Sequence, residues 1–206
     1  YASLQAALPN LVSQLTSQGW NYHIATIPMA QGTGASYAAP VISRVLVDGS
    51  MNYATDPNTG VANAGYVNPS YAVTNASQLQ TFYPINSLIG ANEQTFRGIT
   101  DALATDSVHF IREDAQLAIV VITNGEDHSG SDETSWKNSI MAAAHKTNLQ
   151  SVLFMPVASS RYVGNGSCLN ENATYGARYI NMSYQFTSSW FFDVCSINSS
   201  LNSLVS

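Results

Sequence analysis

Charged residues are scarce in this chain: they make up 10% of its 206 residues, where about 25% is usual for a globular domain. Only seven residues are basic and they are scattered singly, so the sequence offers no stripe that could neutralise phosphates. Together with a net charge of −6, this argues against nucleic acid as a partner. Hydrophobic residues reach 45%, which excludes a disordered chain. Asn, Ser, Thr, Gln and Tyr supply the polar surface instead, a composition typical of secreted and cell-surface proteins.

Long apolar runs and catalytic signatures are missing as well. The longest apolar stretch lies between Gln116 and Asn124 and is too short for a transmembrane segment. The sequence contains no nucleophile elbow, phosphate-binding loop, His-Glu-x-x-His motif or Cys-x-x-Cys motif, so we expect no enzyme. Asp127, His128 and Ser129 have the residue types of an acyl-transfer triad, and a hydrolase that uses this loop is therefore a further alternative.

Cysteine is almost absent. Cys168 and Cys195 are the only two, and the 169–194 segment between them is unlike the spacing of redox pairs or zinc knuckles. A disulfide, which requires an oxidising compartment, is the preferred interpretation; two buried free thiols are the alternative.

Apolar residues recur with helical and strand periodicities in turn. A helix is predicted from Leu4 to Leu15, and strands are predicted at "NYHIATIPM" and "VISRVLVDG". A loop-rich insertion follows at about 49–88, where Asn, Tyr, Gly and Pro show no sustained period. Further helices are predicted over Glu93 to Ala104 and around Trp136 and Ile140.

The second half of the chain supplies the remaining elements. A strand buried on both faces is predicted at 116–123, further strands at "SVLFMPVA" and "ARYINM", and a final helix at "INSSLNSLVS". The alternation, with connections long enough for crossovers, predicts one α/β domain over residues 1–206. Its sheet is expected to be doubly wound and mostly parallel, with helices on both faces.

One long stretch resembles a known family. The segment "FIREDAQLAIVVITNGEDHS", preceded by "GANEQTFRGITDAL" and followed by "GSC", "RYI" and "DVC", is similar to von Willebrand factor A (VWA) domains of bacterial surface and secreted proteins. The resemblance covers most of the chain and is strongest between Gly90 and Asn124. It implies an extracellular, cell-surface or outer-envelope module with a Rossmann-like sheet. At the carboxyl edge of that sheet, three loops would hold Mg²⁺ in an adhesion site that binds an acidic side chain of a protein partner.

When the family's metal ligands are placed on this sequence residue by residue, the implied metal site is incomplete. The first strand and its Asp-x-Ser-x-Ser loop should precede Tyr1 and are absent from this chain, Asn92 stands near the family's Thr, and Asn124 replaces its Asp. A neutral amide attracts Mg²⁺, Ca²⁺ or Mn²⁺ less than a carboxylate does. The candidates for the metal are Asn92, Asn124 and Asp127, and those for the ligand-binding loop are Glu93, Gly125, Glu126 and Ser129.

Two binding functions remain open. The chain either mediates adhesion through this degenerate metal site, or acts as a metal-free structural module of a cell-envelope assembly. Asp127 to Ser131 also matches Asp-x-Ser-x-Ser, although capping of the following helix by Ser129 with Asp132, or by Asp132 itself, explains the same residues.

The resemblance has two further consequences. It implies that Cys168 and Cys195 are bonded to each other. In a sheet of order 3-2-1-4-5-6 the absent first strand is central, between the 22–28 strand and the 116–123 strand. We therefore expect an upstream segment of a longer polypeptide, or another chain, to supply that strand.

Overall fold

The fold is α/β within the part of the chain that the computed structural model describes. The described residues are 13–25, 27, 39–40, 45–47, 72–73, 93–106, 110–123, 125–158, 176–187 and 190–193. Among these residues, no helix combines the length and the apolar character needed to cross a membrane.

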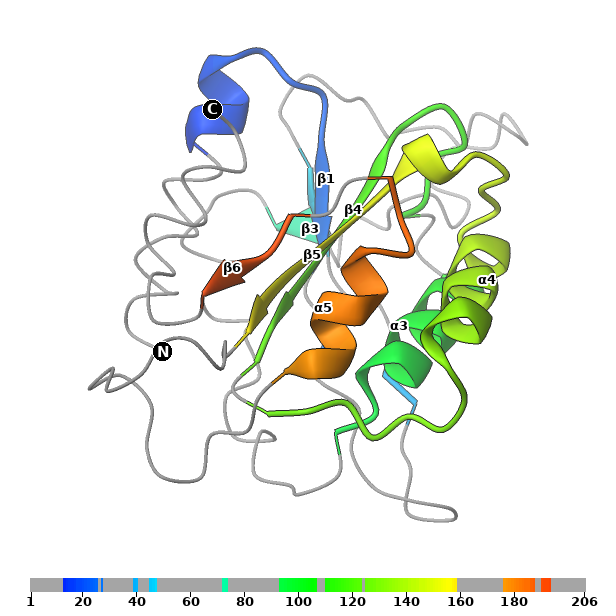
Figure 1. Cartoon of the computed structure of the whole chain (residues 1–206). Helices are drawn as coiled ribbons and strands as arrows, with labels where there is room; N and C mark the ends of the chain where they lie inside the picture. Colours follow the sequence, from blue (N-terminus) through cyan, green and yellow to red (C-terminus); the bar gives the residue numbers. More distant parts are fainter. Residues whose placement is uncertain are drawn as a thin grey trace.

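The described strands form two three-stranded sheets (Figure 1). In the first, β1 (His23–Ala25) pairs antiparallel with β2 (Val45–Val47), which pairs parallel with β3 (Ala72–Val73). In the second, β4 (Leu117–Ile122), β5 (Val152–Ala158) and β6 (Phe192–Asp193) are all parallel. One face of the sheet β4-β5-β6 packs against the main hydrophobic core.

Three helices pack beside this second sheet. They are α3 (Thr95–Ala104), α4 (Glu133–Ala143) and α5 (Ala177–Ser183); α4 contacts both other helices, and α5 contacts β5 (Figure 1). An aromatic cluster joins helices to sheet, because the Phe96 ring lies edge-on to the rings of Tyr179 and Phe154, with centroids 5.5 and 6.1 Å away. Burial of these large side chains is the main source of stability in such a core.

Most predicted elements are confirmed where they fall on described residues. The predicted helices at 93–104 and around Trp136 are α3 and α4, and the strands at 116–123 and "SVLFMPVA" are β4 and β5. Residues 13–17 are helical and overlap the first predicted helix, β1 and β2 lie within their predicted strands, and β3 is a short strand in the insertion. The "INSSLNSLVS" segment lies outside the described residues.

The prediction of a strand at "ARYINM" is wrong, because this segment is helix α5. Tyr179, Met182 and Ser183 are buried at helical spacing, which places one face of the segment in the core. The last described strand is β6, Phe192–Asp193.

The prediction that the 116–123 strand is buried on both faces is also wrong. Ala118 is exposed, and Ile119, Val120 and Ile122 are only half-buried. By contrast, β5 is buried at every residue except Leu153, because it has a strand on each side. In the described part of the chain, β4 has a partner strand on one side only.

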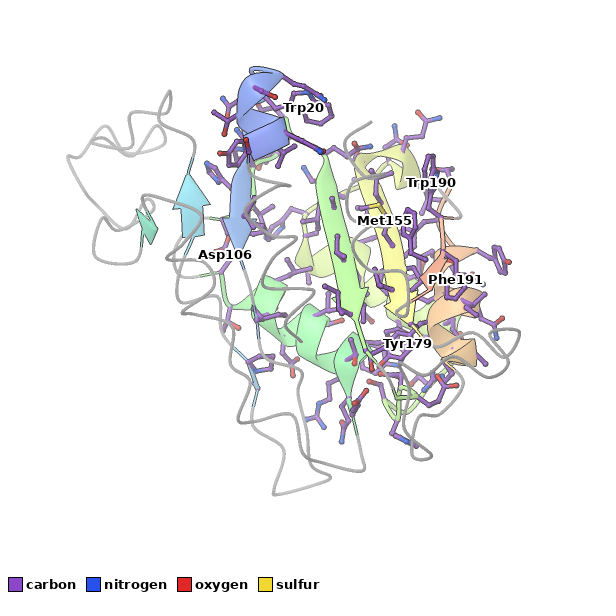
Figure 2. All side chains as sticks on the ribbon, turned by 90° about the vertical axis from the view of Figure 1, so that its left-hand side faces the viewer. Trp20, Asp106, Met155, Tyr179, Trp190 and Phe191 are labelled. Atoms are coloured by element: carbon purple, nitrogen blue, oxygen red, sulfur yellow. The ribbon has the colours of Figure 1, made fainter. Side chains whose placement is uncertain are left out.

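The segments that lead into β1 and β4 contact each other, although the two strands do not pair. Arg112 donates hydrogen bonds to the side chain and carbonyl of Asn21 at 2.6 and 3.0 Å, so the approaches to the two strands are tied together. His23 in β1 also contacts the Phe110 carbonyl through Nδ1 at 3.2 Å. Figure 2 shows the arrows of β1 and β4 pointing the same way. No ladder between β1 and β4 is present among the described residues, and the prediction of an inserted strand stays a prediction.

A buried lysine fixes the segment that leads into β4. The Nζ of Lys146, just beyond α4, donates to the carbonyls of Arg112, Glu113 and Ala115 at 2.6 to 2.8 Å. Burial lowers the pKa of Lys146 below its ordinary value. This contact sets where β4 begins, and therefore where its carboxyl end delivers the polar loop that follows.

Candidate functional site

The polar loop at 123–133 follows the carboxyl end of β4, the edge at which open α/β sheets usually keep their sites. It carries four carboxylates, from Glu126, Asp127, Asp132 and Glu133. Glu126, Asp127 and Asp132 each accept hydrogen bonds from the first turn of a different helix, and Glu133, the first residue of α4, pairs with Arg178 of α5.

Glu126 caps α5. Its Oε2 accepts a hydrogen bond from the Ala177 amide at 2.8 Å, and its Oε1 accepts one from the Arg178 amide at 3.1 Å. The first amides of a helix have no partner within the helix and carry partial positive charge, so a carboxylate there is doubly favourable. Gly176, the residue before α5, offers no side chain for this purpose.

Asp127 caps α3 from a distant part of the sequence. Its Oδ1 accepts from the Phe96 amide at 3.2 Å and from the Ser129 hydroxyl at 2.9 Å. Its Oδ2 accepts from the Ser129 amide at 3.0 Å and from Nη1 of Arg178 at 2.9 Å. The residue is 2% exposed. Burial raises the pKa of Asp127 above its ordinary value, while the Phe96 amide, the Ser129 hydroxyl and the Arg178 guanidinium act in the opposite direction.

Ser129 completes the same cap. Its hydroxyl oxygen accepts a hydrogen bond from the Arg97 amide at 3.2 Å, next to the amide that Asp127 binds. The local residue Gln94 makes no side-chain capping bond to α3. Two backbone amides in the first turn of α3 therefore donate their hydrogen bonds to the loop after β4.

Asp132 caps α4. This confirms the sequence-based alternative in which Asp132 is the cap of the helix that follows the loop. Its carboxylate accepts from the amide and the hydroxyl of Ser135 at 2.8 and 3.1 Å. These hydrogen bonds lower the pKa of Asp132 below its ordinary value, with the Ser135 amide as the largest cause.

Arg178 ties the capped helices to one another. From the first turn of α5, its guanidinium pairs with Asp127 and with Glu133 of α4, both at 2.9 Å, and lies 5.3 Å from the centre of the Phe96 ring. It also donates to the carbonyls of Ser129 and Ser131. One side chain thus joins the loop, α4, α5 and the aromatic core.

Glu93 occupies the centre of the sheet edge. Its Oε2 accepts from the Thr123 hydroxyl at 2.9 Å, and the Tyr179 hydroxyl lies 3.5 Å from the same oxygen. The hydroxyls of Tyr179 and Thr95 are in turn 2.7 Å apart. Burial raises the pKa of the Glu93 carboxyl above its ordinary value. Figure 2 shows Tyr179 near the ends of β4 and β5, beside this loop.

Gly125 packs against the side chain of Glu93. A Cβ added there would lie 2.9 Å from both carboxylate oxygens of Glu93, so any side chain at this position would have to displace the Glu93 carboxylate. The carbonyl of Glu93 also accepts from the His128 amide at 2.6 Å. Glu93 and the loop after β4 therefore meet at this edge.

The structure brings together all four predicted loop residues, Glu93, Gly125, Glu126 and Ser129, together with Asp127. Asn92, Asn124, Cys168 and Cys195 lie outside the described residues. Sequence reasoning missed Arg178 and Tyr179. A helical interpretation of "ARYINM" would have placed Arg178 in a first turn, within reach of acidic residues.

The described carboxylates do not fit the implied Mg²⁺ site. All four acceptor positions of Asp127 receive hydrogen bonds, and Arg178 already supplies the opposite charge. Both oxygens of Glu126 are likewise bound to helix amides. In the described ranges, no group of three or more His, Cys, Asp or Glu side chains could hold a metal ion.

The loop also lacks the geometry of an acyl-transfer triad. Ser129 is 1% exposed, and its hydroxyl donates to Asp127 rather than to an imidazole. His128, which a triad would need between them, is exposed. In this arrangement Asp127 and Ser129 are helix-capping residues, and His128 is a surface histidine.

Comparisons with protein-family models, with curated proteins and with solved structures find no match to this chain. Its function is therefore argued from the geometry of the loop and its surroundings.

Proposed function

We propose that this chain is an extracellular or envelope-surface module that binds protein and acts in assembly, with a loop after β4 that serves as a frame and not as a metal centre. The observation that carries the proposal is the use of the loop's carboxylates. Glu126, Asp127 and Asp132 each cap a different helix, and Arg178 neutralises the most deeply buried of them. A loop with this role fixes helix positions and has few acceptors left for a cation.

The proposed architecture is the doubly wound VWA-like sheet that the sequence suggests, with no central strand among the described residues. Its support is the division of the described strands into two groups of three, with β1 beside β4 at the boundary. Both strands run the same way in Figure 2, as the two strands that flank a parallel central strand would.

Exposed aromatic side chains support a protein as the ligand. Tyr184, just after α5, is 65% exposed, and Trp190, just before β6, is 54% exposed. The Trp190 and Phe192 rings are 6.2 Å apart. Tyrosine and tryptophan are enriched at protein interfaces because they bury much area at little entropic cost. The hydrogen bonds from the α5 amides to Glu126 and the ion pairs of Arg178 fix the position of α5. Because Tyr184 directly follows α5, they also fix the position of this exposed aromatic residue.

Calorimetric titration of Mg²⁺, Mn²⁺ and Ca²⁺ into the full chain separates this function from metal-dependent adhesion. We expect no saturable heat from the wild-type chain with any of the three ions. Asn124→Asp is the matched variant, because it adds the carboxylate that the VWA pattern has at this position. Saturable Mg²⁺ binding by the wild-type chain would overturn the metal-free proposal in favour of an adhesion site that includes Asn92 and Asn124.

A hydrolysis assay addresses the enzymatic alternative. The chain is incubated with p-nitrophenyl esters, and His128→Ala serves as the variant because the exposed His128 side chain is not part of any cap. We expect no turnover above background from either protein. Turnover by the wild-type chain that His128→Ala abolishes would replace the binding function with a hydrolase.

A further inference from the structure

Alternate residues of the loop after β4 direct oxygen atoms at one cation, the guanidinium of Arg178. We infer that residues 127, 129, 131 and 133 form an oxygen cage that is selective for a guanidinium group, and that Arg178 fills this cage where the VWA pattern would have a metal ion. The inference rests on the proposed metal-free function and deepens it, because it names the chemical class of cation that the loop accepts.

The cage draws its oxygens from every second residue of the loop. Asp127 Oδ2 accepts a hydrogen bond from Nη1 of Arg178, and Glu133 Oε1 accepts one from Nε, both at 2.9 Å. Between these carboxylates, the carbonyl of Ser131 accepts from Nη2 at 2.6 Å, and the carbonyl of Ser129 accepts from Nη1. The donors come from one side chain of α5, and the acceptors all come from one short loop.

The backbone of the loop is arranged to turn these carbonyls toward the arginine. Ser131 has a φ of 69°, in the left-handed region that residues other than glycine seldom adopt. The carbonyl of Gly130, between the two caged carbonyls, accepts from the ring nitrogen of Trp136 instead. Successive carbonyls therefore have different partners, and the cage receives those of Ser129 and Ser131.

The cage fits a planar cation better than a metal ion. Each of the three guanidinium nitrogens has an oxygen acceptor of its own, so the oxygens lie around the rim of a flat group. A metal ion needs its oxygens to converge on one point, at about 2.0 to 2.6 Å for Mg²⁺ and Ca²⁺. The forked, directional donors of a guanidinium match a set of oxygens that is spread out in this way.

One side of the cage is aromatic, which favours the same cation. The ring of Phe96 is fully buried, and its centre lies 5.3 Å from the guanidinium carbon of Arg178. A guanidinium is weakly hydrated and is attracted to the face of an aromatic ring. Mg²⁺ gives up its water reluctantly, so an apolar ring is a poor neighbour for it.

The charge of the cage requires a positive occupant. The Asp127 side chain is fully buried and the Glu133 side chain is only 21% exposed. A buried carboxylate without an opposite charge is strongly destabilising. The Arg178 side chain is 22% exposed, so the cage has a side open to solvent through which a small cation can enter once the arginine is removed.

Chemical rescue tests the inference. Arg178→Ala empties the cage of the full chain, and guanidinium chloride is added up to about 50 mM at constant ionic strength, well below denaturing concentrations. The Tm is measured at each concentration. We expect the Tm of Arg178→Ala to rise by about 3 °C or more, because the free ion binds the folded state. The Tm of the wild-type chain should not rise, because Arg178 already fills its cage.

Three controls establish the selectivity of the cage. Methylammonium has the same charge as guanidinium without the planar fork and should give a smaller rise in Tm, and Mg²⁺ and Ca²⁺ should give none. Arg97→Ala removes an arginine whose pair with Asp101 is more than a third exposed, and guanidinium should not raise its Tm. Absence of a rise for Arg178→Ala with guanidinium, or an equal rise with either metal ion, would overturn the inference.

Arg178→Lys keeps the inference testable if Arg178→Ala does not fold. Lysine retains the positive charge on α5 but lacks the fork, so we expect a Tm below that of the wild-type chain. A wild-type Tm for Arg178→Lys would show that charge alone suffices, and would overturn the guanidinium cage. The proposed metal-free function fails only if the wild-type chain itself binds a divalent ion, so the two failures are distinguishable.

Discussion

Removal of the Arg178 guanidinium is the most informative single perturbation of the loop. Arg178→Met keeps much of the side-chain length that packs against Phe96, but removes the ion pairs to Asp127 and Glu133. Asp127 would then be a buried carboxylate with hydrogen bonds but no opposite charge. The substitution therefore tests whether the loop depends on internal charge compensation.

The expected loss at neutral pH is about 3 kcal/mol of unfolding free energy, the lower end of the range for breaking a buried ion pair. The lower end applies because the Arg178 side chain is 22% exposed and water can replace part of its contribution. The loss should shrink as the pH falls. Burial already raises the pKa of Asp127, and the variant lacks the cation that lowers it. The folded variant therefore takes up a proton above the ordinary value of 3.8 and regains stability toward that pH.

Urea unfolding at about pH 7 and about pH 4 measures both effects. Arg97→Met is the matched control, because Arg97 pairs with Asp101 at 3.7 Å and both side chains are more than a third exposed. An exposed pair of this kind is worth less than about 1 kcal/mol. The reasoning fails if Arg178→Met costs no more than Arg97→Met, or if its loss is larger at the lower pH.

Three further substitutions test the centre of the sheet edge. Burial raises the pKa of Glu93, so the wild-type chain should gain stability as pH falls toward 4.5, and urea unfolding of Glu93→Gln should show a weaker pH dependence. Gly125→Ala should cost about 1 kcal/mol or more, because the added Cβ forces the Glu93 carboxylate away from its hydrogen bond, whereas Gly130→Ala meets no atom within 4 Å and should cost less. Tyr179→Phe should lower the unfolding free energy by about 1 to 2 kcal/mol through the lost bond to Thr95; no change would contradict a buried hydrogen bond there.

The sequence predicts the elements whose periodicity is long and regular. α3 has a continuous apolar face, α4 has its own cap at Asp132, and β5 has an unbroken apolar run. "ARYINM" is too short for its periodicity to distinguish a strand from a helix. Two tertiary contacts decide for the helix, because Glu126 caps its first amides and Tyr179 packs on Phe96.

The composition of the site was predictable from the sequence, but the role of its residues was not. Polar residues after a buried strand indicate that they gather at the sheet edge, and the structure places Glu93, Gly125 and Asp127 there. Their role depends on which amides they meet, and those amides are far away along the chain. Phe96 is 31 residues from Asp127, and Ala177 is 51 residues from Glu126. Local sequence rules recognise only a cap such as Asp132, which lies next to its helix.

Amide hydrogen exchange in single-cap variants tests the central claim most directly, because each carboxylate is assigned to one helix. Glu126→Ala should accelerate exchange at Ala177 and leave Ser135 unchanged, and Asp132→Ala should accelerate exchange at Ser135 and leave Ala177 unchanged. This crossed pattern is the result expected of a loop that serves as a helix-capping frame. Unchanged exchange at both helix starts in both variants would contradict the account and return these carboxylates to the candidates for ligand binding.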